Sequence, residues 1–232
     1  MAQGLRKAFG DYPVLRSLDL KVEWGKLVVV FGANGSGKTT LMRLLSTQYR
    51  PDAGEIWVAG RARSKNPSAI RRIIGVVAHQ PMLYDEMTCA ENLLFFGRMH
   101  SVKDLAQRID SVLGQVGLDA LRNRRVRTLS HGMQKRLAFG RAILHDPPIL
   151  LMDEPESGLD QEAMDTMGEL VRQRAEDGGA VVMTTHNVDM GLAWADEVAV
   201  LSGGRIALQA PRQGLDVASF RSTYLRKMEV VA

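Results

Sequence analysis

The stretch that decides the fold is Leu27-Val-Val-Val-Phe31, followed by Gly32-Ala-Asn-Gly-Ser-Gly37-Lys38-Thr39. The first five residues are apolar and rich in valine, so they predict a strand buried on both faces. The next eight match G-x-x-x-x-G-K-[ST] at every fixed position, and residues 38–45 read as a helix. A strand, a glycine-rich turn and a helix in this order direct backbone N–H groups and a helix N-terminus toward a polyphosphate.

The residue types in this loop fit the chemistry of a bound triphosphate. Glycines are needed because a Cβ would block the approach of phosphate oxygens. Lys38 would bridge the β- and γ-phosphates, and the Thr39 hydroxyl would bind Mg²⁺. An ordinary strand-to-helix turn is the alternative, and the strand and helix on either side disfavour it. The predicted phosphate-binding residues are Asn34, Gly35, Ser36, Gly37, Lys38, Thr39 and Thr40.

Length and composition fit one α/β domain around this strand. The chain has 232 residues, of which 45% are hydrophobic and 24% charged, so disorder and coiled coil are excluded. The single cysteine, Cys89, permits no internal disulfide and no cysteine-based zinc site. No apolar run exceeds residues 27–31, so we expect no membrane span or signal peptide. A net charge of +4 says little about partners.

Short strands alternate with helices along most of the chain, as in an α/β domain. Between about residues 81 and 144 the pattern becomes helical. Thr88 with Glu91, and Ser101 with Asp104, resemble capping boxes that open helices. One helical face would carry Leu105, Ile109, Val112, Leu113 and Val116. Further strands are expected at residues 56–58, 73–78, 149–152, 180–184 and 198–201.

Two adjacent carboxylates, Asp153 and Glu154, end the apolar strand at residues 149–152. Successive strand residues point in opposite directions, so the two can serve one site only in different roles or if the backbone bends. Asp153 suits Mg²⁺, and Glu154 suits a general base that polarises the attacking water. Two solvated acids at a strand exit are the alternative, which a phosphate loop on the same chain disfavours.

Three further motifs separate the possible nucleotide-hydrolysing classes. Gln80, at the entrance to the helical stretch, could reach the metal or the attacking water. Ser130 is a predicted N-cap and forms, with Gly132, a second anion site. His186 could bond a γ-phosphate, although a satisfied loop histidine is the alternative. A GTPase would need an N-K-x-D motif, which the chain lacks, and a P-loop kinase needs no second anion site.

In this order the motifs resemble the ATP-binding cassette of ABC transporters, over about residues 5–205. The resemblance implies an α/β fold: a P-loop NTPase (RecA-like) core with an antiparallel β subdomain and a helical insertion subdomain at about residues 81–144. Residues 1–232 would form one ATP-binding domain with a C-terminal tail at about 207–232. It also implies a transport-coupled ATP hydrolase with ATP and Mg²⁺ as cofactors.

The resemblance also assigns roles to residues. The catalytic residues would be Lys38, Gln80, Glu154 and His186, and the Mg²⁺ ligands Thr39, Gln80 and Asp153. ATP would further contact Ser130, Gly132, Asp160 and an aromatic residue on adenine, with Phe9 first and Tyr12 second. The usual L-S-G-G-Q is here Leu129-Ser-His-Gly-Met133, so Met133 removes an amide partner and His131 adds a titratable group without an assigned role.

The implied partners are a second cassette and integral membrane subunits, with no direct nucleic-acid contact. Two cassettes, identical or not, would associate head to tail, so that each ATP lies between the phosphate loop of one and residues 130–133 of the other. The subunit would lie on the cytoplasmic face of the cell membrane. The alternative is a soluble cassette ATPase acting on ribosomes or DNA.

Residues 78–100 are similar to the corresponding stretch in the ATP-binding subunit of the haem exporter of cytochrome c maturation. Alternatively, this stretch docks the membrane subunit of a drug, lipid or polysaccharide exporter. The tail gives little signal, and we expect Phe220 and Tyr224 to pack a short helix on the core.

Overall fold

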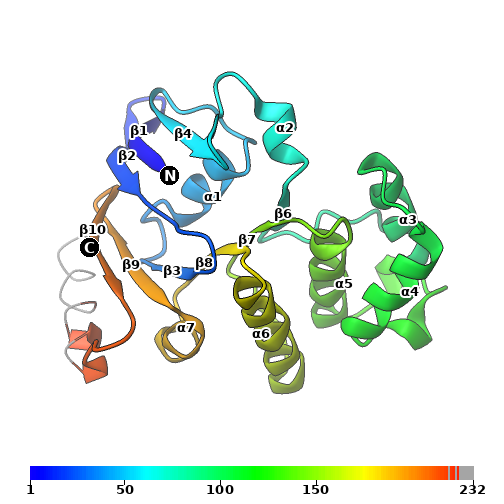
Figure 1. Ribbon diagram of the computed structural model, residues 1–232. Coiled ribbons are helices and arrows are strands. Elements are labelled where there is room, and N and C mark those ends of the chain that lie inside the picture. Colours follow the sequence, from blue (N-terminus) through cyan, green and yellow to red (C-terminus); the bar gives the residue numbers. More distant parts are fainter. Residues whose placement is uncertain (219, 223, 225–232) are drawn as a thin grey trace.

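Two β-sheets and a lateral group of helices make up the molecule. The computed structural model describes residues 1–218, 220–222 and 224 (Figure 1). The larger sheet has the strand order β10 (Arg205–Pro211), β9 (Glu197–Ser202), β3 (Leu27–Phe31), β8 (Ala180–Thr185), β7 (Ile149–Asp153) and β6 (Ile74–Val77). All neighbours are parallel except β9 and β10. Every residue of β3, β7 and β8 is buried, which explains their continuous apolar runs.

The smaller sheet is antiparallel and covers one side of the core. Its strand order is β2 (Tyr12–Leu20), β1 (Ala2–Phe9), β4 (Ala53–Val58) and β5 (Arg61–Ala62). Helix α1 (Lys38–Leu45) shares one buried cluster with both sheets, through residues such as Leu5, Leu18, Val28 and Leu41. The short helix α2 (Pro67–Arg71) leads from this sheet to β6. Together the sheets give the mixed α/β fold that the sequence predicts.

Three helices form the lateral group, drawn in green in Figure 1. They are α3 (Cys89–Met99), α4 (Leu105–Gln115) and α5 (His131–Ile143), with 3₁₀ turns at Asp119–Leu121 and Val126–Thr128. The capping box at Thr88 and Glu91 is confirmed, since each side chain accepts a hydrogen bond from the other residue's backbone N–H. The predicted apolar face of α4 is also confirmed, with Ile109, Val112 and Leu113 buried.

The second predicted capping box, at Ser101, is wrong. Helix α4 begins at Leu105, its N-cap is Asp104, and no side chain caps it. Ser101 has a left-handed backbone with φ of 55°, and its N–H donates to the Arg98 carbonyl at the end of α3. The serine therefore closes the preceding helix instead of opening the next one.

The remaining helices flank the large sheet. They are α6 (Gln161–Glu176) and α7 (Val188–Trp194). Met167, Met183 and Met190 are buried in the main apolar cluster, as expected for methionines that fill a core. In the described part of the chain, no helix is both long enough and apolar enough to cross a bilayer.

The C-terminal segment packs on the core. Strand β10 runs into the stretch that the sequence left unassigned. Phe220 and Tyr224 are buried, and their rings lie 5.2 and 6.1 Å from that of Phe31, the residue that precedes the phosphate loop. Arg221 forms an ion pair with Asp189 of α7. The expected packing of the two aromatic residues on the core is therefore confirmed.

Removing the Phe220 ring should destabilise the whole domain. We expect Phe220→Ala to lower the free energy of unfolding by about 3 kcal/mol, because the change leaves a cavity against Phe31. Urea denaturation followed by circular dichroism measures this, with exposed Met99→Ala as the control. A loss below about 1 kcal/mol would show that this segment is detachable from the core.

Candidate active site

The phosphate loop joins β3 to α1. Gly37 is the N-cap of α1 with φ of 105°, a conformation that favours glycine. A Cβ built on Gly32 would lie 2.5 Å from Ser36 Oγ and 2.8 Å from the Leu201 carbonyl oxygen. Ser36 Oγ is buried and has no hydrogen-bond partner among the described residues. The loop therefore forms a tight cradle with an unused polar atom, which fits a phosphate group.

Lys38 is buried beside this loop. Its Nζ donates to the carbonyl oxygens of Gly32 at 2.8 Å and Ala33 at 3.1 Å. It also lies 3.1 Å from Glu154 Oε1 at the end of β7. One ammonium group thus binds two carbonyl oxygens of the loop and connects the loop to Glu154 after β7.

A backbone bend brings Asp153 and Glu154 to one site. Glu154 has a left-handed φ of 48°, which is uncommon for a residue with a side chain and occurs often at functional sites. Its N–H donates to the Thr184 carbonyl oxygen at 3.0 Å, while Thr184 Oγ1 donates to Asp153 Oδ1 at 2.7 Å. The bend is the condition under which two successive residues of a strand can serve the same site.

Two cationic or polar groups converge on Glu154. Lys38 reaches Oε1, and His186 Nδ1 lies 3.6 Å from Oε2. Burial of Glu154 opposes its ionisation, but the hydrogen bond and charge of Lys38 outweigh it, so the pKa of Glu154 is lowered. The side chain is therefore an ionised acceptor at neutral pH, in the state that a general base requires.

The three predicted magnesium ligands line one cavity. Thr39, Gln80 and Asp153 surround a space of about 300 Å³ beside the phosphate loop. Hydroxyl, amide and carboxylate oxygens suit Mg²⁺, which is usually held by one or two carboxylates together with substrate phosphates. Among the described residues no group of three or more His, Cys, Asp or Glu side chains forms a metal site. These residues fit Mg²⁺ that arrives with a nucleotide.

Helix α5 fixes the segment that carries Gln80. Lys135 is fully buried, and its Nζ donates to the His79 carbonyl oxygen at 2.5 Å. Arg141 donates to the carbonyl oxygens of Met82 at 2.8 Å and Val76 at 2.9 Å. Neither residue was predicted from the sequence. A signal existed, since Lys135 lies three and four positions before buried Ala138 and Phe139 on one helical face.

Residues 129–133 form a separate cluster. Ser130 Oγ accepts a hydrogen bond from the Met133 N–H at 3.2 Å, which confirms the predicted N-cap of α5. A Cβ on Gly132 would lie 2.7 Å from the Gly158 carbonyl oxygen. Met133 is partly buried and packs against the core. Within the described part of the chain, no hydrogen bond or ion pair joins this cluster to the phosphate loop.

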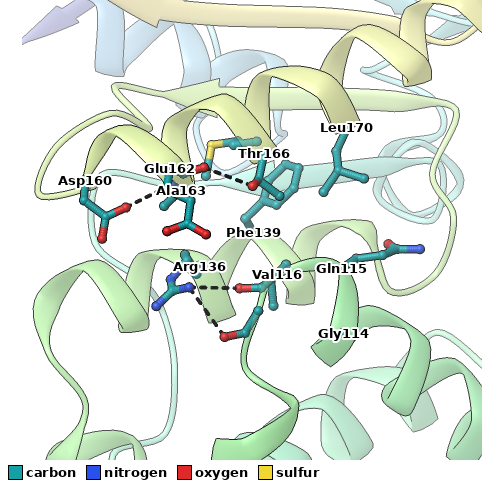
Figure 2. A pocket seen from close by; sticks show the side chains of 12 residues that line it. Gly114, Gln115, Val116, Arg136, Phe139, Asp160, Glu162, Ala163, Thr166 and Leu170 are labelled. Carbon is teal, nitrogen blue, oxygen red and sulfur yellow. Dashed lines mark hydrogen bonds between the residues drawn. The ribbon is translucent and has the colours of Figure 1, made fainter.

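Asp160 lies at the mouth of a cleft between the lateral helices and α6 (Figure 2). The cleft measures about 340 Å³, and Arg136 projects into it with its Nη1 3.5 Å from the carbonyl oxygens of Val116 and Gly117. Asp160 Oδ1 accepts from the Ala163 N–H at 2.9 Å and so caps α6. The structure thus gives Asp160 a capping role, and its nucleotide contact stays a prediction.

Two aromatic residues were candidates for an adenine contact. Phe9 and Tyr12 are paired at the turn between β1 and β2, and they are 45% and 80% exposed. Phe9 packs edge-on against Tyr49 at 5.6 Å, so its ring is already held. Farther along β2, the side chains of Leu15 and Val14 would lie 3.0 and 3.1 Å from a Cβ built on Gly37 of the phosphate loop. Both rings therefore belong to a hairpin that borders the loop.

Comparison with known proteins gives one consistent family. A family model described as "ABC transporter" matches residues 15–157. The "ABC transporter ATP-binding protein NatA" of Bacillus subtilis is 32% identical, over 87% of this chain and 83% of that protein. The "Nod factor export ATP-binding protein I" of a Rhizobium species is 37% identical, over 87% of this chain and 67% of that protein.

A solved structure of a dimeric ATP-binding cassette in a post-hydrolysis state, bound to ADP and phosphate, is also similar. It superimposes with a TM-score of 0.85 at 25% identity and covers 92% of this chain and 99% of that one. The similarity therefore extends over nearly all of the fold described above.

Replacing Lys38 should abolish tight nucleotide binding. Lys38→Ala removes a buried cation, its two hydrogen bonds to loop carbonyl oxygens and its ion pair with Glu154, so we expect ATP affinity to fall by at least about tenfold. Isothermal titration calorimetry measures the affinity, with exposed Lys65→Ala as the matched control. Unchanged ATP binding by a folded Lys38→Ala protein would show that the phosphate loop is not part of the nucleotide-binding site.

Proposed function

The chain belongs to the ABC transporter family, and from that premise we propose that it powers export through separate membrane subunits. It is the ATP-binding subunit of an ABC transporter and an ATP hydrolase. The observation that carries the proposed site is the convergence of Lys38 and His186 on Glu154, at the edge of the sheet where the phosphate loop begins.

Each converging residue has a task in hydrolysis. Lys38 binds the β- and γ-phosphates, and Glu154 accepts a proton from the attacking water. His186 donates to the γ-phosphate. Thr39, Gln80 and Asp153 would hold Mg²⁺, which would supply charge neutralisation at the phosphates. Lys38 pairs with Glu154, so a bound phosphate would compete with this carboxylate for the same ammonium.

The second anion site requires a second cassette. Ser130 and Gly132 lie at the N-terminus of α5, in a cluster that, among the described residues, forms no hydrogen bond or ion pair with the phosphate loop of the same chain. In the proposed dimer they contact the ATP held by the partner, together with Asp160, and the aromatic hairpin contacts adenine. The dimeric cassette that resembles this fold supports such an arrangement. Binding of ATP would then join two subunits, and hydrolysis would release them.

Blocking hydrolysis should trap the dimer. We expect Glu154→Gln to lower kcat by about 10²- to 10³-fold and to elute as a dimer with ATP, because nucleotide binds but the general base is lost. Gel filtration with ATP and Mg²⁺ measures the assembly, and exposed Glu169→Gln is the control. If Glu154→Gln stays monomeric, and the wild-type rate per subunit is independent of protein concentration, the shared site is wrong.

A groove between α3, α5 and the core suits the membrane subunit. It measures about 470 Å³ and is lined by Arg71, Arg72, Met82, Met99, His100, Arg141 and His145, among others. Met82 and Met99 are 52% and 67% exposed. Burial lowers the pKa of His145 to about 4, so the positive charge comes from the arginines. We assign this face to an apolar segment with acidic residues.

Reversing the charge of this groove should uncouple the subunits. We expect Arg72→Glu combined with Met99→Glu to prevent co-purification of the membrane subunit from detergent-solubilised membranes. The ATPase rate of the isolated chain should stay within about twofold of the wild type, since neither residue lies in the catalytic site. Arg61→Glu on β5 is the matched control. Undiminished co-purification would place the docking surface elsewhere.

For the transported substrate we propose haem, exported for cytochrome c maturation from the cytoplasmic face of the membrane. The support is the similarity of residues 78–100, which include part of the groove. The name of the Nod factor export relative supports the proposed direction of transport, but it points to a substrate other than haem. Haem-stimulated ATPase activity in proteoliposomes with the membrane subunit would support haem. Stimulation by drugs, lipids or polysaccharides would favour those exporters, and salt-sensitive nucleic-acid binding would favour a non-transport ATPase.

A further inference from the structure

Glu156 is an acidic residue beside the site that the proposed mechanism does not use. It follows Glu154 by two positions, and its Oε1 accepts a hydrogen bond from Thr185 Oγ1. Its Oε2 is buried and has no hydrogen-bond partner among the described residues. Burial raises the pKa of Glu156, in contrast to that of Glu154. A partly desolvated carboxyl group is costly to maintain, so its contact with Thr185 calls for an explanation.

The contact belongs to a pair of equivalent bonds at the end of β8. Thr184 and Thr185 are both fully buried, and successive strand residues point in opposite directions. Thr184 Oγ1 donates to Asp153, and Thr185 Oγ1 donates to Glu156. The two hydroxyls therefore tie both acidic positions that flank Glu154 to the strand that leads into His186.

Thr185 extends the connection to the far side of His186. The Asn187 N–H donates to Thr185 Oγ1 at 2.9 Å, and Asn187 Oδ1 caps α7 by accepting from the Met190 N–H at 3.1 Å. The Thr185 hydroxyl has one proton, which it gives to Glu156, and so its oxygen is free to accept from Asn187. One hydroxyl thus fixes the residues before and after His186.

The His186 side chain has little other support. Its ring is 59% exposed, and the described contact of its Nδ1 is with Glu154 Oε2 at 3.6 Å. The position of the ring therefore depends mainly on the backbone turn that carries it. That turn is held through Thr185, and the orientation of the Thr185 hydroxyl is set by Glu156.

We propose that Glu156 is a positioning residue that holds the His186 turn, through the Thr185 hydroxyl, in the place required for ATP hydrolysis. The inference rests on the proposed role of His186. An acceptor is needed at this position because the Thr185 hydroxyl must point its proton away from Asn187. A carboxylate provides a stronger acceptor than a neutral group. Glu156 acts through His186 and makes no proposed contact with the nucleotide.

Steady-state kinetics of three variants test the connection. We expect Glu156→Leu to lower kcat about tenfold and to leave KM for ATP within about twofold, since it removes an acceptor and no nucleotide contact. Thr185→Val removes this bond from the other end and also the bond from the Asn187 N–H, so its loss of kcat should be at least as large. Glu156→Gln keeps an acceptor oxygen and should retain at least about a third of kcat. Exposed Glu169→Leu on α6 is the matched control.

A double-mutant cycle separates positioning from general support of the fold. In a His186→Ala background, single-turnover hydrolysis should show no further loss from Glu156→Leu, because the residue it positions is absent. An equal loss in both backgrounds, or no rescue by Glu156→Gln, would overturn the inference while leaving the role of His186 intact. Full kcat in His186→Ala alone would instead refute the proposed role of His186, and with it the positioning by Glu156.

Discussion

The buried ion pair between Lys38 and Glu154 is the contact on which the site depends. It joins the phosphate loop after β3 to the bend after β7, across the intervening strand β8. A buried lysine without a partner would be strongly unfavourable, so the pair also compensates the desolvation of both groups. Because a triphosphate offers Lys38 a second anion, binding of nucleotide would weaken its hold on Glu154. The proposed phosphate binding by Lys38 and the release of Glu154, the proposed general base, would thus be linked through one ammonium group.

Sheet register explains why the other residues meet there. Phe31 pairs with Thr185, and Asp153 pairs with Thr184, so three parallel strands end at the same level. Ligand sites of open parallel sheets form at this carboxyl edge. The backbone register alone therefore brings together the residues that follow these strands, namely the phosphate loop, Glu154 and His186. Hydrogen bonds from Thr184 and Thr185 then fix Asp153 and Glu156, the acidic residues on either side of Glu154.

The sequence predicted the parts that local pattern determines. Buried parallel strands are continuous apolar runs, and the phosphate loop has fixed glycine spacing, so both were found. The hairpin of β1 and β2 was missed because its half-buried strands have bulges that disturb the alternation. Ser101 was misplaced because a serine that follows a helix and one that begins a helix look alike in sequence. Lys135 and Glu156 were missed because their partners, His79 and Thr185, lie 56 and 29 positions away.

Helix α5 connects the two halves of the site within one chain. Ser130 caps its N-terminus, Lys135 binds His79 in its first half, and Arg141 binds Met82 near its end. A helix moves as a rigid body. If the γ-phosphate of ATP bound to a second subunit displaced its N-terminus, the segment that carries Gln80 would therefore move as well. The same segment borders the groove beside Met82 and Met99. A contact between Ser130 and the second subunit would therefore displace residues both at the proposed metal cavity and at the surface assigned to the membrane subunit. The hydrogen bonds of Lys135 and Arg141 would transmit this displacement.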